Sequence, residues 1–221
     1  MSNSDWHEAQ KLELTWWSAA RDRLASSAFI DQKKHAALEL WKAISSMLPE
    51  RPLHVLEVGT GGDALVNFIP DSFCVGLEPL IIEMKRQETG IFLPSVNFVC
   101  GVGERLPFRD NSFDVVFSYN VLDHTFNPEM GLDEIARVLR VRGVIYILLD
   151  SYSMTFKLYR RLYRPDPMHP HTFTPREVYE MLASRGFRVA ADVSDRKPAG
   201  KRRHRAIRAF CVLDRKYSRT P

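Results

Sequence analysis

The stretch that decides the fold is LHVLEVGTGGD, residues 53–63. It begins as a short apolar run rich in Val and Leu, which is typical of a buried parallel strand. It ends in Gly59, Gly61 and Gly62, where the chain can turn sharply and a ligand can approach the backbone closely. We expect residues 64–69 to begin a helix. A strand, a glycine turn and a helix, in that order, open the nucleotide-binding part of a doubly wound sheet.

Carboxylates around this turn indicate which kind of nucleotide it holds. The glycine spacing fits a dinucleotide fingerprint, and Glu78 follows about 20 residues later, as that fingerprint requires. Glu57, however, lies at the strand end, where it can accept hydrogen bonds from an ammonium group, and Asp63 repels a phosphate at the helix N-terminus. We therefore expect a phosphate-free cofactor with an amino acid end and a ribose, such as S-adenosylmethionine (SAM). The alternative is a tight strand–helix turn in which Asp63 is an N-cap.

Length and composition indicate one soluble domain with an added segment. The 221 residues are enough to bury a full core, and 45% hydrophobic and 26% charged residues are ordinary values. The polar N-terminus has no signal-peptide core, and the apolar run 144–149 is far too short to span a bilayer. We therefore expect a cytoplasmic protein that has no membrane partner.

The cysteines and the charge distribution further limit the kinds of site and partner that the sequence predicts. Cys74, Cys100 and Cys211 lie within or beside apolar strand runs, which indicates free thiols, and no Cys/His spacing predicts a metal site. The net charge of +4 is concentrated in residues 157–164 and 196–208. These clusters can bind RNA or attract an anionic small substrate, but solvated surface is the favoured interpretation because the second cluster contains Pro and Gly.

Residues 1–50 are expected to form a helical cap that precedes the domain of residues 51–221. Apolar residues recur at helical spacing across residues 32–47. The segment is rich in aromatic side chains, namely Trp6, Trp16, Trp17, Phe29 and Trp41. The favoured interpretation is that these side chains cover the sheet. The alternative is a lid over the cofactor or a wall of the substrate site.

Strand and helix patterns alternate after the glycine turn, which predicts a parallel sheet with right-handed crossovers. A helix is expected from the cap Asn127 to about Arg140, with a break at Gly143, and another helix is expected to begin at a capping box over residues 174–177. The connection between the last two strands has no helical pattern and predicts an antiparallel hairpin. The expected class is α/β, a doubly wound, mostly parallel seven-stranded sheet with the last strand reversed. The later strands are expected at Phe73–Leu77, Val96–Cys100, Phe113–Ser118, Val144–Leu149, Phe187–Val193 and Ile207–Leu213.

Four segments together resemble a known family. LEVGTGG, GLEP, the LPF loop with NSFDVVFS, and EIARVLRVRGVIYI occur in the order and spacing of class I SAM-dependent methyltransferases of the small-molecule type. The resemblance covers about residues 50–215. It implies a Rossmann-like seven-stranded sheet, with SAM across the strand ends at the switch point.

The resemblance also implies roles for individual residues. Gly59 and Gly61 would let the methionine and ribose approach the backbone. Glu57 would help hold the amino end, and Glu78 would bind the ribose hydroxyls. Asn120 would lie beside the methionine portion.

Two positions depart from the family pattern. The backbone around Val102 and Gly103 would meet the adenine, but the family usually has an acid where Val102 stands, so a side-chain bond to the adenine amino group is lost. The third family glycine is replaced by Asp63. This replacement is tolerable if the helix begins there, but it removes freedom for close approach.

Candidate catalytic residues follow the fourth strand, where acceptor and sulfonium should meet. Methyl transfer from a sulfonium needs a general base only if the acceptor is a hydroxyl or a protonated amine. His124 is the candidate base or substrate orienter, with Asp123 as its helper. An equal alternative is that both residues only shape the turn. His169 and His171 lie in a proline-rich loop, where a plain surface role is the favoured interpretation.

The predicted function is transfer of a methyl group from SAM to a small-molecule acceptor, such as a hydroxyl of a sugar or another metabolite. One alternative is a non-catalytic methyltransferase-like binding subunit, because Val102 is unusual and no catalytic constellation is decisive. Another is an RNA methyltransferase that uses the basic clusters. An NAD-binding oxidoreductase is disfavoured by Glu57 and Asp63. The sequence does not indicate the oligomeric state.

Overall fold

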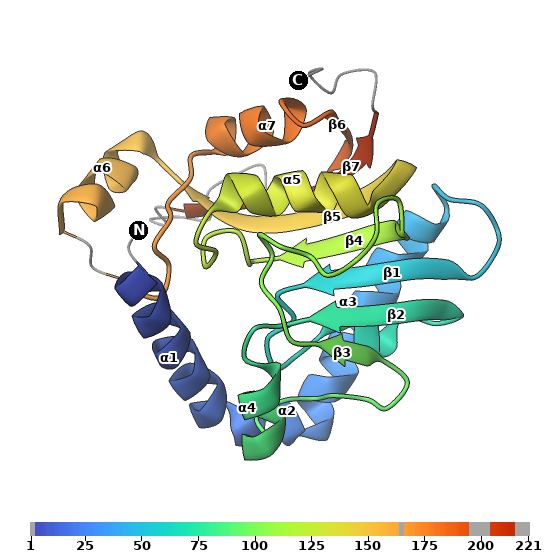
Figure 1. Ribbon diagram of the computed structural model, residues 1–221, viewed down its shortest axis with the longest axis horizontal. Coiled ribbons are helices and arrows are strands. Elements are labelled where there is room, and N and C mark those ends of the chain that lie inside the picture. The colour runs from blue at the N-terminus through green and yellow to red at the C-terminus, as the bar shows by residue number, and fades with distance from the viewer. Residues whose placement is uncertain (1–2, 164–165, 195–203, 215–221) are drawn as a thin grey trace.

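The computed structural model describes residues 3–163, 166–194 and 204–214, and these residues form an α/β fold built on one seven-stranded sheet (Figure 1). The strand order is β3-β2-β1-β4-β5-β7-β6. The strands are β1 (Leu53–Val58), β2 (Ser72–Leu77), β3 (Asn97–Val99), β4 (Phe113–Tyr119), β5 (Leu139–Tyr152), β6 (Phe187–Asp192) and β7 (His204–Leu213). The predicted fold class is confirmed.

Strand direction creates the crevice in which such sheets bind ligands. β1 pairs in parallel with both β2 and β4, so its chain neighbour β2 and its other neighbour β4 lie on opposite sides of it. The order of the strands therefore reverses at β1, and ligands bind outside the carboxyl ends at such a point. β7 pairs antiparallel with β5 and with β6, which confirms the expected reversed strand.

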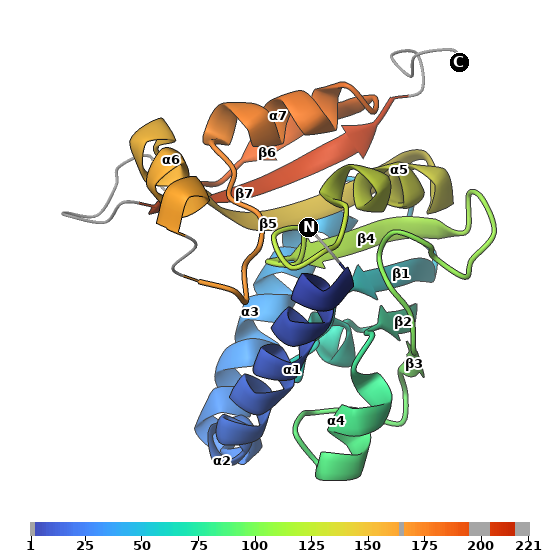
Figure 2. The same ribbon diagram turned by 60° about the vertical axis from the view of Figure 1, so that its left-hand side comes forward.

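Helices cover both faces of the sheet (Figures 1 and 2). One buried cluster includes Leu56, Val116 and Ile135, and it lies between the sheet and the helices α5 and α7. The other includes Val55 and Ile44, and it lies between the sheet and α3. The helices are α1 (Asn3–Ala19), α2 (Arg21–Ala25), α3 (Ser27–Ser45), the 3-10 helix η1 (Leu65–Phe68), α4 (Ile81–Gln87), α5 (Pro128–Val138), α6 (Met154–Tyr163) and α7 (Pro175–Ala183).

Side-chain caps fix the starts of the two helices on the α5 side. Asn127 Oδ1 accepts hydrogen bonds from the backbone N–H groups of Glu129 and Met130, each at 3.1 Å. Thr174 and Glu177 form a reciprocal capping box at the start of α7. Both caps satisfy N–H groups that have no partner inside the helix, and both were predicted from the sequence.

Two predicted helix boundaries are wrong. The helix expected over residues 64–69 is only the short η1, because Pro70 holds the residue before it in an extended conformation, with Ile69 at ψ 118°. The helix expected to reach Arg140 ends at Val138, and β5 begins at the next residue. Arg140 Nη1 lies 2.6 Å from Asp114 Oδ2 on β4, which holds this stretch beside the sheet.

The N-terminal helices have two different positions. α3 packs on the sheet with Ala37 and Ile44 fully buried, and the partly buried Trp41 lies against the same cluster, as the favoured interpretation predicts. α1 instead passes in front of the carboxyl ends of the strands and contacts α4 (Figure 2). Ser18 Oγ on α1 donates a hydrogen bond to Gln87 Oε1 at the end of α4, at 2.9 Å.

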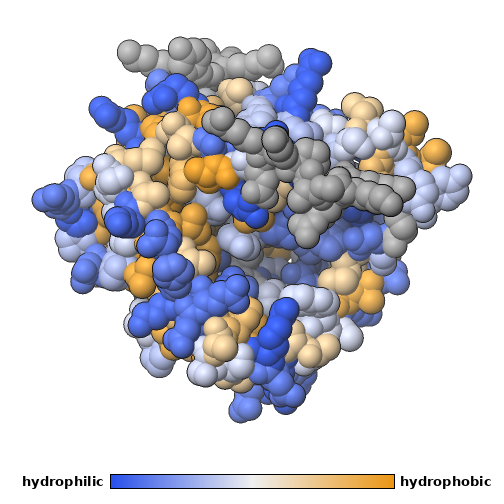
Figure 3. Space-filling model, turned by 180° about the vertical axis from the view of Figure 1, so that it is seen from behind, coloured by the Kyte–Doolittle hydropathy of each residue, from blue (hydrophilic) through white to orange (hydrophobic). Residues whose placement is uncertain are grey.

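The remaining sequence predictions concern the basic clusters, membrane spans and the cysteines. Of the basic cluster predicted over residues 196–208, residues 196–203 lie outside the described residues. Among the described helices, none has the length and apolar character needed to cross a membrane. Figure 3 shows the face opposite to that of Figure 1, where hydrophobic side chains occur in small groups between hydrophilic ones. Cys74 and Cys211 are buried and Cys100 is exposed, and all three are free thiols.

Candidate functional site

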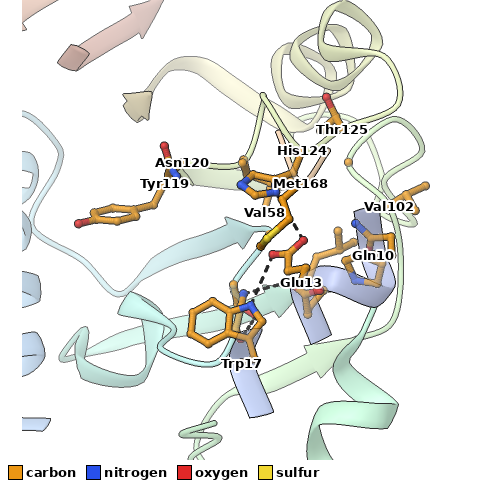
Figure 4. A pocket seen from close by; sticks show the side chains of 18 of the residues that line it. Gln10, Glu13, Trp17, Val58, Val102, Tyr119, Asn120, His124, Thr125 and Met168 are labelled. Carbon is orange, nitrogen blue, oxygen red and sulfur yellow. Dashed lines mark hydrogen bonds and ion pairs between the residues drawn. The ribbon is translucent and has the colours of Figure 1, made fainter. Parts of the chain in front are cut away.

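A cavity of about 490 Å³ lies at the carboxyl ends of β1, β2 and β4 (Figure 4). Its floor is formed by the ends of these strands, within residues 57–63, 77–79 and 119–121. Its roof is formed by residues 6–17 of α1 and residues 166–169. The lining includes His124 and all of the residues predicted to surround SAM, namely Glu57, Gly59, Gly61, Glu78, Val102, Gly103 and Asn120.

Glu57 is a buried carboxyl group at the end of β1. Only 2% of the residue is exposed, and its Oε2 accepts a hydrogen bond from the backbone N–H of Val66 at 3.0 Å. Burial raises its pKa to about 8, although the N–H of Val66 and the nearby ammonium of Lys33 act in the opposite direction. A cationic group in the cavity would therefore be attracted to this residue and would favour its charged form.

Glu78 is a second buried carboxyl group, at the end of β2. Its Oε2 accepts a hydrogen bond from the N–H of Gly61 at 2.9 Å, and its Oε1 accepts one from the N–H of Leu80 at 3.0 Å. Burial raises its pKa to about 7, and the carboxylate of Glu13 on α1 acts in the same direction. Both oxygens are held in place by backbone donors and can still accept a further hydrogen bond from a ligand hydroxyl.

The packing of neighbouring side chains requires glycine at two positions of the turn after β1. Gly59 has φ +68°, and a Cβ atom there would lie 2.1 Å from Val121 Cγ2. Gly61 has φ +53°, and a Cβ atom there would lie 2.2 Å from Cζ2 of Trp17 on α1. The expectation was that both glycines leave room for a cofactor. The space over Gly61 is taken by the Trp17 indole, so this glycine permits the packing of the roof on the floor.

Asn120 and Val102 complete the predicted set. Asn120 directly follows β4 with φ +53°, a conformation that Asn tolerates better than most residues. Its side-chain Oδ1 is buried and has no hydrogen-bond partner among the described residues. Val102 lies on the cavity wall and brings no polar side-chain group to it, as the sequence predicts.

Asp63 does not cap the helix that follows it. The residue before η1 is Ala64, which makes no side-chain cap bond, and the Asp63 carboxylate lies 2.6 Å from Lys33 Nζ on α3. The N-cap alternative is therefore wrong. The ion pair instead joins the glycine turn to α3, and the lysine partly offsets the negative charge at this end of the cavity.

Gln10 and Glu13 of the roof were not predicted from the sequence. Gln10 and Glu13 line the cavity together with Trp17, whose Nε1 lies 3.5 Å from Glu13 Oε1. Burial raises the pKa of Glu13, and Gln10 Oε1 is buried with no partner among the described residues. The signal was present in the sequence, because Trp6, Gln10, Glu13 and Trp17 follow the spacing of one helix face. Trp6 and Trp17 therefore fit the alternative interpretation of the aromatic segment, a wall of the site.

The candidate catalytic pair lies between floor and roof. His124 Nδ1 is 3.6 Å from Glu13 Oε2, and His124 Nε2 is 4.0 Å from Asp123 Oδ1. Asp123 does not line the cavity but is buried behind His124. The His169 ring lies 4.4 Å from the His124 ring, so His169 belongs to the site, whereas His171 bonds to the carbonyl of Thr125 at 2.9 Å.

These features fit SAM. The cavity lies within the size range of small-molecule sites. The buried carboxyl groups of Glu57 and Glu78 and the partly buried one of Glu13 line it, which suits a cation and excludes a phosphate-rich ligand. The unpartnered oxygens of Asn120 and Gln10 offer acceptors for hydroxyl or ammonium hydrogens.

Comparisons with known proteins agree with this fit. Residues 56–147 match the family described as methyltransferase domain. The chain is 31% identical over 150 residues to the uncharacterized protein MJ1123 of Methanocaldococcus jannaschii, covering 66% of this chain and 69% of that protein. It is 34% identical over 133 residues to demethylmenaquinone methyltransferase of Deinococcus radiodurans, covering 53% of this chain and 54% of that protein.

Structural similarity extends over nearly the whole chain. The fold is similar to that of Burkholderia thailandensis 1,6-didemethyltoxoflavin-N1-methyltransferase, solved with 1,6-didemethyltoxoflavin and S-adenosylhomocysteine. The TM-score is 0.58 at 15% identity, and the match covers 94% of this chain and 89% of that chain. The chain spans only 37% to 45% of the length of several other curated relatives that it matches. With the methyltransferase domain matched across β1 to β5 and curated methyltransferases among its relatives, the chain belongs to the class I SAM-dependent methyltransferases, and its cofactor is SAM.

Proposed function

We propose that this methyltransferase acts on a hydroxyl oxygen of a small molecule, such as a sugar or another hydroxylated metabolite. The observation that supports this most is the position of His124, which shares the cavity with Glu57 and Glu78. A histidine ring can accept a proton at neutral pH, and a hydroxyl acceptor is one that must lose a proton during methyl transfer.

The cofactor would occupy the floor of the cavity. Glu78 accepts hydrogen bonds from the ribose hydroxyls, and Glu57 attracts the positively charged end of the cofactor. The backbone at Val102 and Gly103 meets the adenine, and Asn120 Oδ1 accepts a hydrogen bond from the amino acid portion. When bound, SAM supplies an activated methyl group that a nucleophile displaces directly from sulfur. The chain therefore needs mainly to align the acceptor and to exclude water.

The acceptor would lie between the cofactor and the roof. His124 orients the hydroxyl and takes its proton as the oxygen forms its bond to the methyl carbon. Asp123, 4.0 Å from His124 Nε2, and Glu13, 3.6 Å from His124 Nδ1, stabilise the positive ring that results. The indoles of Trp6 and Trp17 provide flat apolar surface for the rest of the acceptor.

A quinone-type ring is the second acceptor to test. The Deinococcus relative is a demethylmenaquinone methyltransferase, and the aromatic roof suits a flat ring. The match covers only 54% of that relative, so the substrate does not transfer with the domain. An RNA acceptor is supported only by the charge of residues 157–164 and 196–208.

The test has two steps. A thermal-shift comparison of SAM, S-adenosylhomocysteine and NAD should show stabilisation of about 2.7 kcal/mol by SAM at 100 times its Kd. Stabilisation by NAD alone would contradict the cofactor assignment. Mass spectrometry should then detect a gain of one methyl group in a hydroxylated compound from a panel of sugars, phenols, quinols, amines and RNA. A product formed only with RNA, with steep salt dependence of binding, would overturn the small-molecule acceptor.

A further inference from the structure

A group of three side chains at the edge of the cavity has the composition of a metal site. Asp123 and His124 follow β4, and His169 lies in the loop before α7. One ligand atom from each residue lies within 4.8 Å of the ligand atoms of the other two. We propose that Asp123, His124 and His169 bind a divalent transition-metal ion.

The buried carboxylate of Asp123 indicates that this group of side chains holds a cation. Its side chain is 4% exposed, and Oδ1 has no hydrogen-bond partner among the described residues. A buried carboxylate without a partner is strongly destabilising, so native proteins pair such a group or use it to bind a cation. His124 Nε2 lies 4.0 Å from this oxygen, which is beyond hydrogen-bond distance and leaves a gap between the two atoms.

His169 is oriented in the way that many metal-binding histidines are. Its Nδ1 lies 2.7 Å from Asp166 Oδ2, and a metal-binding histidine commonly donates its second ring N–H to a carboxylate, which fixes the ring and its tautomer. Nε2 of His169 is then available for an ion. His124 Nε2 faces Asp123, while its Nδ1 lies 3.6 Å from Glu13 Oε2 and has no hydrogen-bond partner among the described residues. Arg160 supports the outer partner of His169, because its Nη2 is 2.7 Å from the His169 carbonyl and 3.6 Å from Asp166 Oδ2.

The ligand types select the class of ion. Two imidazoles and one carboxylate suit Zn²⁺ and related transition metals, whereas Mg²⁺ and Ca²⁺ prefer oxygen ligands. Ligand atoms on a tetrahedral Zn²⁺ lie roughly 3.3 Å apart, given bonds of about 2.0–2.1 Å. The 4.0 Å between His124 Nε2 and Asp123 Oδ1 therefore has to shorten by under ~1 Å when an ion binds, which small side-chain rotations provide.

Three protein ligands leave a coordination position open, and here it would face the cavity. If the proposed function holds, an acceptor hydroxyl on that position would lose its proton more readily, because a bound cation stabilises the anion. His124 would then orient the acceptor as a ligand of the ion. This consequence rests on the proposed function, but ion binding itself does not.

The test uses full-length protein without a polyhistidine tag, free of SAM and acceptor. Isothermal titration with Zn²⁺, and visible absorption with Co²⁺ as a probe of coordination, should show one ion per chain. His169→Ala and Asp123→Asn should each weaken binding at least ~10-fold. Asp166→Asn, which changes only the outer partner of His169, should weaken it by roughly 10-fold or more. His171→Ala is the matched control in the same loop and should bind like the wild type.

Two results would overturn the site. One is the absence of saturable binding of both ions to wild-type protein. The other is equal affinity in wild type and His169→Ala, which would place the ion elsewhere on the chain. Circular dichroism of each variant separates a lost ligand from a lost fold, and Asp166→Asn remains informative if Asp123→Asn fails to fold. Because no methyl donor is present, a failed ion titration leaves the proposed function intact, and a failed methyl-transfer assay leaves the ion site intact.

Discussion

The floor and the roof of the cavity are built from different kinds of sequence information. The floor consists of residues that directly follow three neighbouring strands, and the topology of the parallel sheet brings them to one edge. The roof consists of α1 and residues 166–169, which lie more than 140 residues apart in the chain. The cofactor half of the site therefore follows from the fold, whereas the acceptor half depends on long-range packing that is particular to this chain.

The floor and the roof also differ in the groups that contact their carboxylates. In the floor, Glu57 and Glu78 are buried and held by backbone N–H groups. In the roof and at its border with the floor, Glu13 and Asp166 contact the rings of His124 and His169. Substitution of a floor carboxyl group should therefore affect cofactor binding first, and substitution of a charged or titratable group at the roof should affect methyl transfer first.

The largest effect is expected for His124→Ala. Loss of a group that deprotonates or orients the acceptor should slow methyl transfer by about 10²–10⁴-fold. The affinity for SAM should remain close to that of the wild type, because the floor is unchanged. Single-turnover assays with saturating SAM would measure this, and unchanged turnover would remove His124 from the mechanism. If an ion is used, His169→Ala should show a comparable loss.

Glu78→Gln should have the next largest effect. The amide oxygen can still accept the hydrogen bond from Gly61, but the negative charge that receives the ribose hydroxyls is lost. Hydrogen bonds to a charged group contribute about 1.5–3 kcal/mol each, so SAM affinity should fall on the order of 100-fold. Glu104→Gln, on the wall of the same cavity, is the control. Calorimetry that finds equal losses in both variants would contradict the role of Glu78.

The stability of the SAM-free and metal-free protein should fall as pH rises. Burial raises the pKa of Glu57 to about 8 and that of Glu78 to about 7, from an ordinary 4.5. The folded state therefore retains protons that the unfolded state has released. This stabilising contribution is complete below pH 4.5 and is lost as pH rises through the folded pKa values, by roughly 3–4 kcal/mol between pH 6 and pH 8.

Charged side chains near Glu57 and Glu78 also shift the pKa values of these two groups. Asp63 raises the pKa of Glu57, Lys33 lowers it, and Glu13 raises that of Glu78. Denaturant unfolding of Glu57→Gln should show a shallower dependence on pH than the wild type. The exposed Glu50→Gln should behave like the wild type. A slope that Glu57→Gln leaves unchanged would show that Glu57 does not titrate in this range.

Trp17→Ala should have the smallest of these effects. The indole is partly exposed and fills the space over Gly61, so its removal separates roof from floor without changing a charge. SAM affinity should fall roughly 10-fold, as expected for lost aromatic contact area. Leu12→Ala, on the same helix outside the cavity, should change affinity little. Equal affinities in all three proteins would show that the roof does not contact the cofactor.

The fold and the floor could be predicted because their signals are local. The run before Gly59, the Asn127 cap and the capping box of α7 each act over a few residues, and all formed as expected. The short η1 and the early end of α5 were missed because Pro70 and the pairing of Leu139 with Phe113 on β4 override a helical pattern. The contact of His169 with His124 could not be predicted, because it depends on how a loop without regular structure folds back.

The central claim is that the floor holds a positively charged, phosphate-free nucleoside. A crystal structure with S-adenosylhomocysteine, which occupies the same place without the reactive methyl group, tests it most directly. The account predicts ribose hydroxyls on the Glu78 carboxylate, the amino acid end near Glu57 and Asn120, and open space beside the sulfur facing His124. A nucleoside bound elsewhere, or one that neither Glu57 nor Glu78 faces, would contradict the account.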